Sequence, residues 1–323
     1  MRVVVLSGGR SSEHDVSLRS GAAVADGLSA AGHEVVAVKI ERDGRWTHEG
    51  AEIEVTPGRG LLDADVVFPV LHGPYGEDGS VQGLLDCLDI AYAGPSVLAA
   101  AICIDKLTFK RLLAFHDIPQ VDFCAAGEAG WREHAAAMAR PLWVKPSRLG
   151  SSVGISKVSS PEQELDAAVE AARRHDPRVI IEAGAAGIEV ECSVIGLADS
   201  PETSLPGQVV AHADWYDFEA KYEPGGMELV VPAPIDEATT TRVRELASEV
   251  YSAASCSGLA RCDFFVTDER EVLVNELNTI PGFTETSVFA KLFEATGVAY
   301  PDLCDRLVQL AVERHEAEAG YEF

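Results

Sequence analysis

Predicted strands and helices alternate through the first 100 residues, and this alternation restricts the possible folds more than any other feature of the sequence. It predicts a parallel sheet with helices on both faces, because parallel strands need a crossover connection between them. The predicted strands cover 2–6, 33–40 and 65–71, and the predicted helices cover 15–32 and 79–88.

Two polar loops follow predicted strands in this first region. The loop SGGRSSEHDVS contains Glu13, and the loop HGPYGEDGS contains His72. Ligands of parallel sheets bind beyond the carboxyl ends of the strands, so both side chains are candidates for a binding site, although a single Glu or His in a loop is more often structural or solvent-facing. The first loop lacks the glycine spacing of a dinucleotide fingerprint, so we do not expect NAD binding.

The organisation changes after the first region. A predicted helix begins at Asp105, which is a candidate N-cap, and a predicted hairpin with a Gly/Ser-rich connection covers 141–158. Helices and hairpins grouped in this way predict α+β layers instead of a second doubly wound domain. The sequence therefore predicts three domains, at 1–100, 101–185 and 186–323.

Composition excludes several classes of protein. The chain has 323 residues and a net charge of −26, which argues against nucleic acid or an acidic membrane as a partner. Its seven cysteines are an odd number and form no CxxC pair, so a disulfide framework is not expected. We see no signal peptide and no apolar run near the ~20 residues that a membrane span needs, and we expect a cytoplasmic protein.

A predicted β-hairpin in the last region, RCDFFVTDEREVLVNELNTIPG (261–282), contains polar residues in strands that otherwise favour burial. A turn of two residues or of four gives the same pairing, in which Asp263 faces Glu276 and Arg261 faces Asn278. Directly opposed residues of antiparallel strands point to the same side, ~5 Å apart. The opposite side is a predicted core face, interrupted by Asn275 and otherwise made of Cys262, Phe264, Val266, Leu273 and Leu277.

The polar face of this hairpin suggests a metal site. Two facing carboxylates repel each other unless positive charge lies between them. A hard cation with oxygen ligands fits this pair, and Mg²⁺ that leaves positions open for phosphate oxygens fits best. The alternative is a strand face that is simply exposed to solvent.

Candidate phosphate ligands occur in three separate elements. The loop LGSSVG, 149–154, has small residues that allow successive backbone N–H groups to point at an anion, although it is not a Walker A motif. Lys145 precedes this loop, Lys106 begins the helix before it, and Lys221 lies in a polar loop further along the chain. These lysines could converge on phosphates, or they could be ordinary surface charges.

Seven segments match one known family in the same order over nearly the full chain: SSEHDVSLRSG, LHGPYGEDGSVQG, DKLTFK, VKPSRLGSSVGISKV, FEAKY, ARCDFF and NELNTIPGFTETS. Together they resemble the D-alanine–D-alanine ligase family of the ATP-grasp superfamily. The resemblance implies an α/β parallel-sheet domain followed by an ATP-grasp fold, in which two α+β subdomains hold ATP between antiparallel sheets. It also implies the reaction: ATP phosphorylates the carboxylate of one D-alanine, the amine of a second attacks the acyl phosphate, and the dipeptide enters peptidoglycan precursors.

The resemblance also assigns metal and nucleotide ligands, motif by motif. It implies two Mg²⁺ or Mn²⁺ ions, bridged by Glu276, that neutralise charge between the β- and γ-phosphates. Glu182 would lie near the adenine and Glu189 at the ribose, and the turn at 151–152 would cover the γ-phosphate. The implied metal ligands are Asp263, Glu276 and Asn278, and the implied ATP-binding residues are Lys106, Lys145, Ser152, Glu182, Glu189 and Lys221.

Substrate roles follow from the same resemblance. Glu13, supported by Ser151, would bind the ammonium of the first D-alanine, and Ser287 would bind the carboxylate of the second. Arg261 and the backbone N–H of Gly282 would form an oxyanion hole. A loop with Lys221 and Tyr222 would close over the site and exclude water. The implied catalytic residues are Glu13, His72, Ser151, Tyr222, Arg261 and Gly282.

Two alternatives remain at this point. One is an ATP-grasp ligase with another acceptor, such as D-lactate or D-serine, or one of secondary metabolism; the FEAKY segment favours D-alanine. The other is a catalytically silent nucleotide-binding protein, against which the retained charged residues argue. The resemblance further implies a homodimer.

Overall fold

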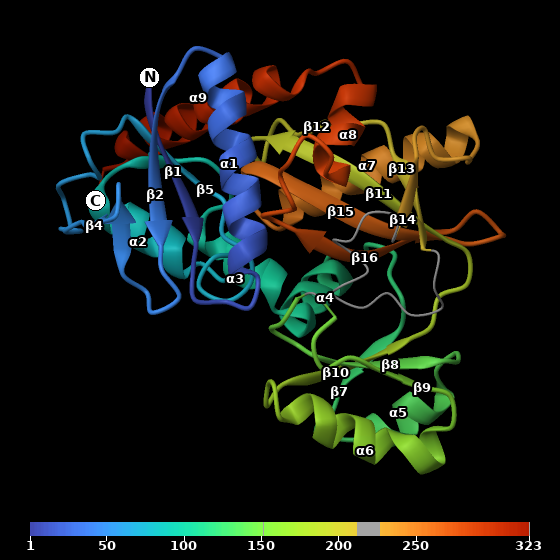
Figure 1. The fold of residues 1–323 in the computed structure, drawn as a ribbon. Coiled ribbons are helices and arrows are strands. Elements are labelled where there is room, and N and C mark those ends of the chain that lie inside the picture. Colours follow the sequence, from blue (N-terminus) through green and yellow to red (C-terminus); the bar gives the residue numbers. More distant parts are fainter. Residues whose placement is uncertain (151, 212–226, 323) are drawn as a thin grey trace.

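The computed structural model describes residues 1–150, 152–211 and 227–322, which form three sheets with helices packed around them. In Figure 1 the first sheet, in blue, and the third sheet, in yellow to orange, lie side by side above the second sheet, in green. Within these ranges, none of the helices has both the length and the apolar character needed to cross a membrane.

The first sheet confirms the predicted parallel strands and adds a short antiparallel hairpin, β3–β4, at one edge. Val3 and Val5 of its central strand pack toward helix α1, while Val4 and Leu6 pack toward helix α2, so both faces are covered. The elements are β1 (Arg2–Gly8), β2 (Glu34–Ile40), β3 (Trp46–His48), β4 (Ala51–Glu52), β5 (Val66–Pro69), β6 (Ala91–Tyr92), α1 (His14–Ala30) and α2 (Ser80–Leu88).

The second sheet is antiparallel, in the order β7-β10-β8-β9. Leu142, Val144 and Ile181 pack against helices α5 and α6 on one face. Because side chains alternate along a strand, Lys145 and Glu182 are placed on the opposite face. The elements are β7 (Phe123–Ala125), β8 (Leu142–Pro146), β9 (Ser156–Val158), β10 (Val179–Ala183), α5 (Trp131–Ala137) and α6 (Pro161–Arg173).

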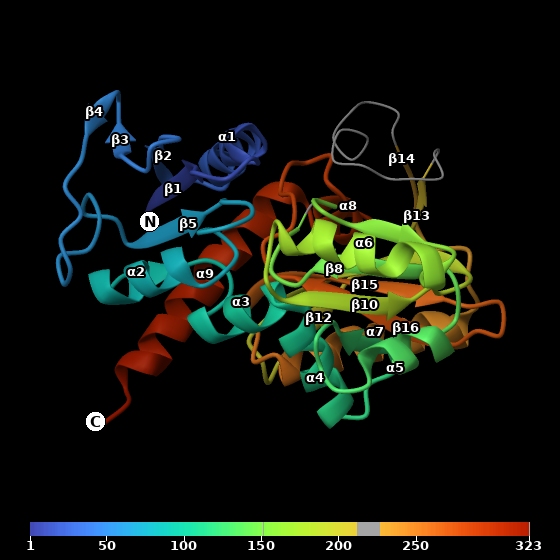
Figure 2. The ribbon, with the colours of Figure 1, turned by 90° about the horizontal axis from the view of Figure 1, so that it is seen from below.

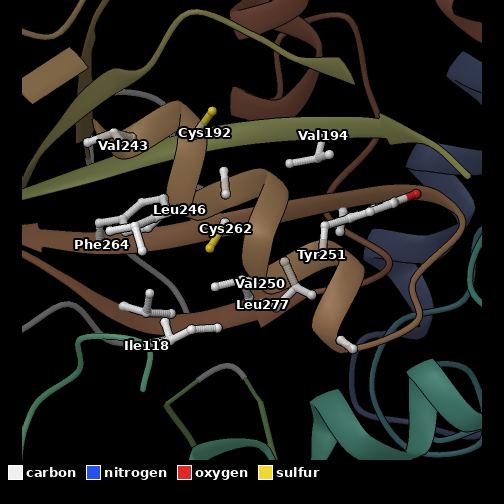
Figure 3. Close-up of a cluster of buried hydrophobic side chains, with 14 of the residues drawn as sticks. Ile118, Cys192, Val194, Val243, Leu246, Val250, Tyr251, Cys262, Phe264 and Leu277 are labelled. Carbon is white, nitrogen blue, oxygen red and sulfur yellow. The ribbon is translucent and has the colours of Figure 1, made fainter. Parts of the chain in front are cut away.

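The third sheet is also antiparallel, and helix α7 covers one of its faces (Figure 3). Leu246 and Val250 of α7 pack against Cys192, Cys262 and Phe264 of the strands. The elements are β11 (Ile188–Gly196), β12 (Glu202–Thr203), β13 (Gly207–Ala211), β14 (Met227–Val230), β15 (Gly258–Val266), β16 (Val272–Asn278) and α7 (Glu237–Ala253), with α3 (Val97–Ile104) and α4 (Lys106–Phe115) packed nearby. Asp105 caps α4 as predicted, since its carboxylate accepts from the N–H of Thr108.

The end of the chain packs against its beginning. After α8 (Val288–Ala295), helix α9 (Tyr300–Ala319) crosses the first sheet, as both Figure 1 and Figure 2 show. Leu303 and Leu307 of α9 share one core cluster with Val3 and Phe68. This packing fixes the first sheet relative to the segment that follows the hairpin of the third sheet.

The predicted hairpin is correct at the polar face and wrong on part of the core face. Asp263 pairs with Glu276 and Arg261 with Asn278, as expected. The register then shifts by one residue, which leaves Asn275 as a bulge. One extra residue reverses the alternation of side chains, so Val272 and Val274 are buried in place of Leu273, which is only partly buried.

Candidate active site

The first and third sheets and helix α4 surround a cavity of about 120 Å³. It is polar, and its walls come from segments separated by more than half of the chain. Seven of the predicted site residues line it: Glu13, His72, Lys106, Arg261, Glu276, Asn278 and Gly282. The other lining residues are Glu77, Cys103, Ile104, Gly150, Leu277, Thr279 and Ile280.

The wall next to the first sheet includes Glu13 and His72, which are both buried. The Ser11 hydroxyl donates to the backbone oxygen of His72 at 2.7 Å, and the backbone N–H of Glu13 donates to the Ser11 hydroxyl at 3.2 Å. Nε2 of His72 lies 3.3 Å from the Ser20 hydroxyl oxygen. A Cβ atom on Gly73 would lie 2.8 Å from Oε2 of Glu13, so this glycine leaves room for the carboxylate.

The opposite wall contains an acid-rich cluster, which we define as Glu191, Arg261 and Asp263. Arg261 donates to both carboxylate oxygens of Asp263, at 2.7 and 2.6 Å, and its Nε lies 2.9 Å from Oε2 of Glu191. Burial acts to lower the pKa of Arg261, but the two carboxylates outweigh it and raise that pKa well above the usual value. The guanidinium is therefore permanently charged and held from two sides.

Sequence reasoning missed Glu191. It lies on β11 directly opposite Asp263 of β15, so the two carboxylates face one another across neighbouring strands. The available signal was the spacing: Glu189 and Glu191 are two residues apart in a strand that otherwise favours burial, and this places both on one face.

The three predicted metal ligands lie on adjacent strands, β15 and β16, in the predicted register. Asp263, Glu276 and Asn278 present two carboxylates and one amide on adjacent strands, which is an oxygen donor set suited to a hard cation. Nζ of Lys106 lies 3.6 Å from Oε2 of Glu276 and donates to the backbone oxygen of Leu149 at 3.1 Å. In the part of the chain that the structure describes, no three His, Cys, Asp or Glu side chains form a metal-binding group.

The second sheet contributes a base-rich cluster, which we define as Lys110, Lys145 and Glu182. Glu182 is 3% exposed, and its carboxylate oxygens lie 2.6 Å from Nζ of Lys145 and 3.3 Å from Nζ of Lys110. Burial acts to raise the pKa of Glu182, but the charges of Lys145 and Lys110 outweigh it and hold that pKa at about 2. Burial also lowers the pKa of Lys110, whereas Glu182 raises the pKa of Lys145 despite burial.

Sequence reasoning identified Lys145 and Glu182 but missed Lys110. The signal was its spacing of four residues from Lys106 on one helix, which places both lysines on the same face. Lys110 was overlooked because lysines on helices are usually exposed, whereas this side chain is 1% exposed.

Among the described residues, three further predicted ones do not line the cavity: Ser152, Glu189 and Ser287. Ser287 is the N-cap residue of helix α8, and a Cβ atom on Gly282 would lie 3.4 Å from its Oγ. Ser152 has a left-handed φ of 61° in the turn after β8, and Glu189 is exposed on β11. Three predicted residues lie outside the described ranges: Ser151, Lys221 and Tyr222.

Comparison with known proteins identifies the family. A model of the D-ala D-ala ligase N-terminus matches residues 2–60 and 53–95, and a model of the D-ala D-ala ligase C-terminus matches residues 112–309. The chain belongs to the D-alanine–D-alanine ligase family. It is 41% identical to the D-alanine–D-alanine ligase of Halothermothrix orenii over 97% of this chain and 98% of that one, and 37% identical to D-alanine–D-alanine ligase A of Escherichia coli K12 over 98% and 97%.

Solved structures agree with this assignment. The D-alanine–D-alanine ligase from Coxiella burnetii has a TM-score of 0.88 at 33% identity, covering 99% of this chain and 96% of that one. The VanG D-Ala:D-Ser ligase from Enterococcus faecalis has a TM-score of 0.86 at 32% identity, covering 96% and 99%. The predicted family and ATP-grasp fold are confirmed, and with them a carbon–nitrogen ligase family that uses ATP and divalent metal ions.

Proposed function

We propose that this protein joins two D-alanines to D-alanyl-D-alanine at the expense of ATP, through an acyl phosphate, to supply peptidoglycan precursors. The single observation that carries the proposal is the cavity, which brings Glu13 and His72 from the first sheet to Arg261, Glu276 and Gly282 from the third. A ligase needs both walls, because one must hold the amino acid while the other stabilises the charge that develops on it.

Binding of the first D-alanine is assigned to Glu13 and His72. The buried Glu13 carboxylate pairs with the substrate ammonium, and Ser151 supports that carboxylate. His72, held by Ser20, lies beside the substrate carboxylate as it becomes phosphorylated. Burial strengthens the ion pair of Glu13, because water that would screen it is excluded.

The phosphoryl group passes from ATP to the carboxylate of the first D-alanine, in the space between the acid-rich and base-rich clusters. Lys106, Lys145 and the turn with Ser152 bind the phosphates, while Glu182 and Glu189 bind the adenine and the ribose. Two Mg²⁺ ions, held by Asp263, Glu276 and Asn278, would supply charge neutralisation between the β- and γ-phosphates. Lys221 and Tyr222 belong to the segment that closes over the acyl phosphate and excludes water.

The amine of the second D-alanine attacks the acyl phosphate, and its carboxylate is bound by Ser287. The tetrahedral intermediate places its negative oxygen against Arg261 and the backbone N–H of Gly282. Arg261 is already oriented by two carboxylates, so it does not have to reorganise during the reaction. The proposal extends to three domains at 1–100, 101–185 and 186–323, a homodimer and a cytoplasmic location.

A mixed-acceptor assay tests the function. Phosphate release with Mg·ATP and D-alanine is measured first, and the products from equal D-alanine, D-serine and D-lactate near neutral pH are then resolved by mass spectrometry. We expect D-alanyl-D-alanine to dominate, because Tyr222 is suited to hold the closed segment over an amine acceptor. A preference of ~10²-fold over D-lactate needs roughly 2.7 kcal/mol of differential transition-state binding. A majority of ester product or of the D-serine dipeptide would move the chain to another acceptor class, and no phosphate release with any acceptor would make it a silent nucleotide-binding protein.

A further inference from the structure

Lys110 is a buried lysine that has no part in the proposed reaction. Its side chain is 1% exposed, its Nζ lies 3.3 Å from Oε1 of Glu182, and the same Nζ donates to the backbone oxygen of Val274 at 3.2 Å. A buried ammonium is unfavourable unless it is paired and hydrogen-bonded. Lys110 satisfies that condition by contacting two different sheets, which indicates a specific role at their junction.

Helix α4 has two lysines on one face, Lys106 and Lys110, and they contact different carboxylates. Lys106 lies near Glu276 of β16, while Lys110 lies near Glu182 of β10. Both also donate to backbone oxygens, those of Leu149 and Val274 respectively. One helix therefore links the strand of the predicted metal ligands to the strand of the predicted adenine ligand.

Both partners of the hydrogen bond between Lys110 and Val274 make a further hydrogen bond that fixes them in place. The backbone N–H of Val274 donates to the oxygen of Pro119 at 2.8 Å, and the side-chain amide of Gln120 donates to the backbone oxygen of Lys110 at 2.9 Å. Val274 directly precedes the bulge at Asn275, two residues before Glu276. Lys110 is thus fixed in place by the strand that carries the metal ligands, and it cannot follow a ligand as a surface lysine would.

Lys145 is more accessible to a ligand than Lys110, because 16% of its side chain is exposed against 1%, and its Nζ lies 2.6 Å from Oε2 of Glu182. A lysine that binds a phosphate must share or leave that carboxylate. If Lys145 left and Glu182 had no second cation, the Glu182 carboxylate would be a buried negative charge without a partner. An unpaired buried charge is strongly destabilising.

We propose that Lys110 is a positioning residue that keeps Glu182 paired, so that Lys145 can turn to the phosphates of the nucleotide. The inference rests on the proposed function, in which Lys145 is a phosphate ligand and Glu182 a nucleotide ligand. The two lysines of the base-rich cluster therefore have different roles. Lys110 remains paired with Glu182, and Lys145 exchanges Glu182 for the phosphates of the nucleotide.

The test is calorimetric titration of the full-length protein with Mg·ADP. Lys110→Met should weaken binding on the order of 10- to 100-fold, as expected when a residue that orients a ligand-binding group is removed. Lys110→Arg, which keeps the charge, should recover part of the affinity. Arg111→Met removes one positive charge from an exposed position of the same helix and should bind like the wild type. If Lys110→Met does not fold, Lys110→Gln, whose amide can still donate to Val274, replaces it.

A double-mutant cycle separates positioning from packing. In a Glu182→Gln background the carboxylate is gone, so Lys110→Met should have little further effect on Mg·ADP affinity. An equal effect in both backgrounds, or normal affinity of Lys110→Met, would overturn the proposal. Because the readout is nucleotide binding, a wild type that binds Mg·ADP with this coupling but makes no D-alanyl-D-alanine would contradict the proposed function and leave the role of Lys110 intact.

Discussion

The acid-rich and base-rich clusters are built from the same kinds of groups in opposite proportion. In the acid-rich cluster one guanidinium lies between two carboxylates, and in the base-rich cluster two ammonium groups flank one carboxylate. Both clusters are mostly buried, so water does not strongly screen the net charge of either one. The comparison teaches that the two clusters differ in the sign of their net charge: carboxylates outnumber cations in the acid-rich cluster, and cations outnumber carboxylates in the base-rich cluster.

In the proposed function, a metal-bound nucleotide suits both clusters at once. Its cation suits the carboxylate-rich third sheet, and its phosphates suit the lysines of the second sheet and helix α4. The excess of carboxylates therefore lies on the third sheet and the excess of lysines on the second sheet and α4, although Lys106 lies near Glu276 where the two groups meet. Interleaved charges would pair with one another and leave little affinity for a ligand, whereas separated charges are preorganised to receive it.

The largest effect is expected from Glu276→Gln, which removes one carboxylate from the metal-binding face while keeping its volume. Turnover in saturating Mg·ATP should fall ~10³-fold, equivalent to about 4 kcal/mol, because the metal stabilises transition-state charge by several kcal/mol. The melting temperature should change little, since Glu276 is partly exposed. Glu269→Gln, at the exposed turn of the same hairpin, is the control, and near-normal turnover of Glu276→Gln would falsify the metal assignment.

Acid denaturation measures the strength of the base-rich cluster. The pKa of Glu182 is about 2 in the folded protein and about 4.5 without its partners, so the stabilisation is complete above ~pH 5 and is lost as the pH falls toward 2. The difference between these pKa values corresponds to up to about 3 kcal/mol. Between pH 5 and pH 2, urea unfolding of the wild type should therefore lose up to about 3 kcal/mol more than that of Glu182→Gln. Parallel losses would show that the lysines do not stabilise the Glu182 carboxylate.

Arg261→Lys tests the geometry of the acid-rich cluster rather than its charge. Lysine cannot reproduce two parallel contacts with Asp263 and a third with Glu191, because its ammonium is a point charge. We expect kcat to fall ~10²-fold, about 2.7 kcal/mol, as for loss of an oxyanion-hole donor. Arg270→Lys changes an exposed ion pair between the turn of the same hairpin and Asp236, the N-cap of α7, and should leave kcat unchanged. Equal kcat values for the two variants would refute the oxyanion role.

The smallest effect is expected away from both clusters, at the wall of the first sheet. An alanine at Gly73 would place its Cβ 2.8 Å from the Glu13 carboxylate and displace it, so KM for the first D-alanine should rise ~10-fold, about 1.4 kcal/mol. Gly73 has a φ of +73°, so the substitution also costs ~1–2 kcal/mol of stability. Gly58→Ala, at a φ of +70° with no atom within 4 Å, is a matched control for that strain. If both variants raise KM equally, Glu13 is not displaced.

Local pattern in the sequence determined much of this protein. The alternation of strands and helices specified the first sheet, and the polar face of the hairpin specified that Asp263 faces Glu276. The N-cap at Asp105 was likewise readable, because capping depends on neighbours within four residues. Family motifs carried the remaining site predictions, including the residues whose roles stay predictions here.

Tertiary structure alone decided which charged groups are buried and with what partners. The bulge at Asn275 could not be read from the strand, since both registers have plausible hydrophobic faces until the core selects one. The sequence of α4 alone suggests that Lys110 is exposed, and only its contacts with β10 and β16 in the folded protein bury it. Glu191 is a partner of Arg261 only because β11 pairs with β15. Charge burial depends on contacts between segments far apart in the chain, where the strength of each interaction is set by the exclusion of water, and no local pattern encodes that exclusion.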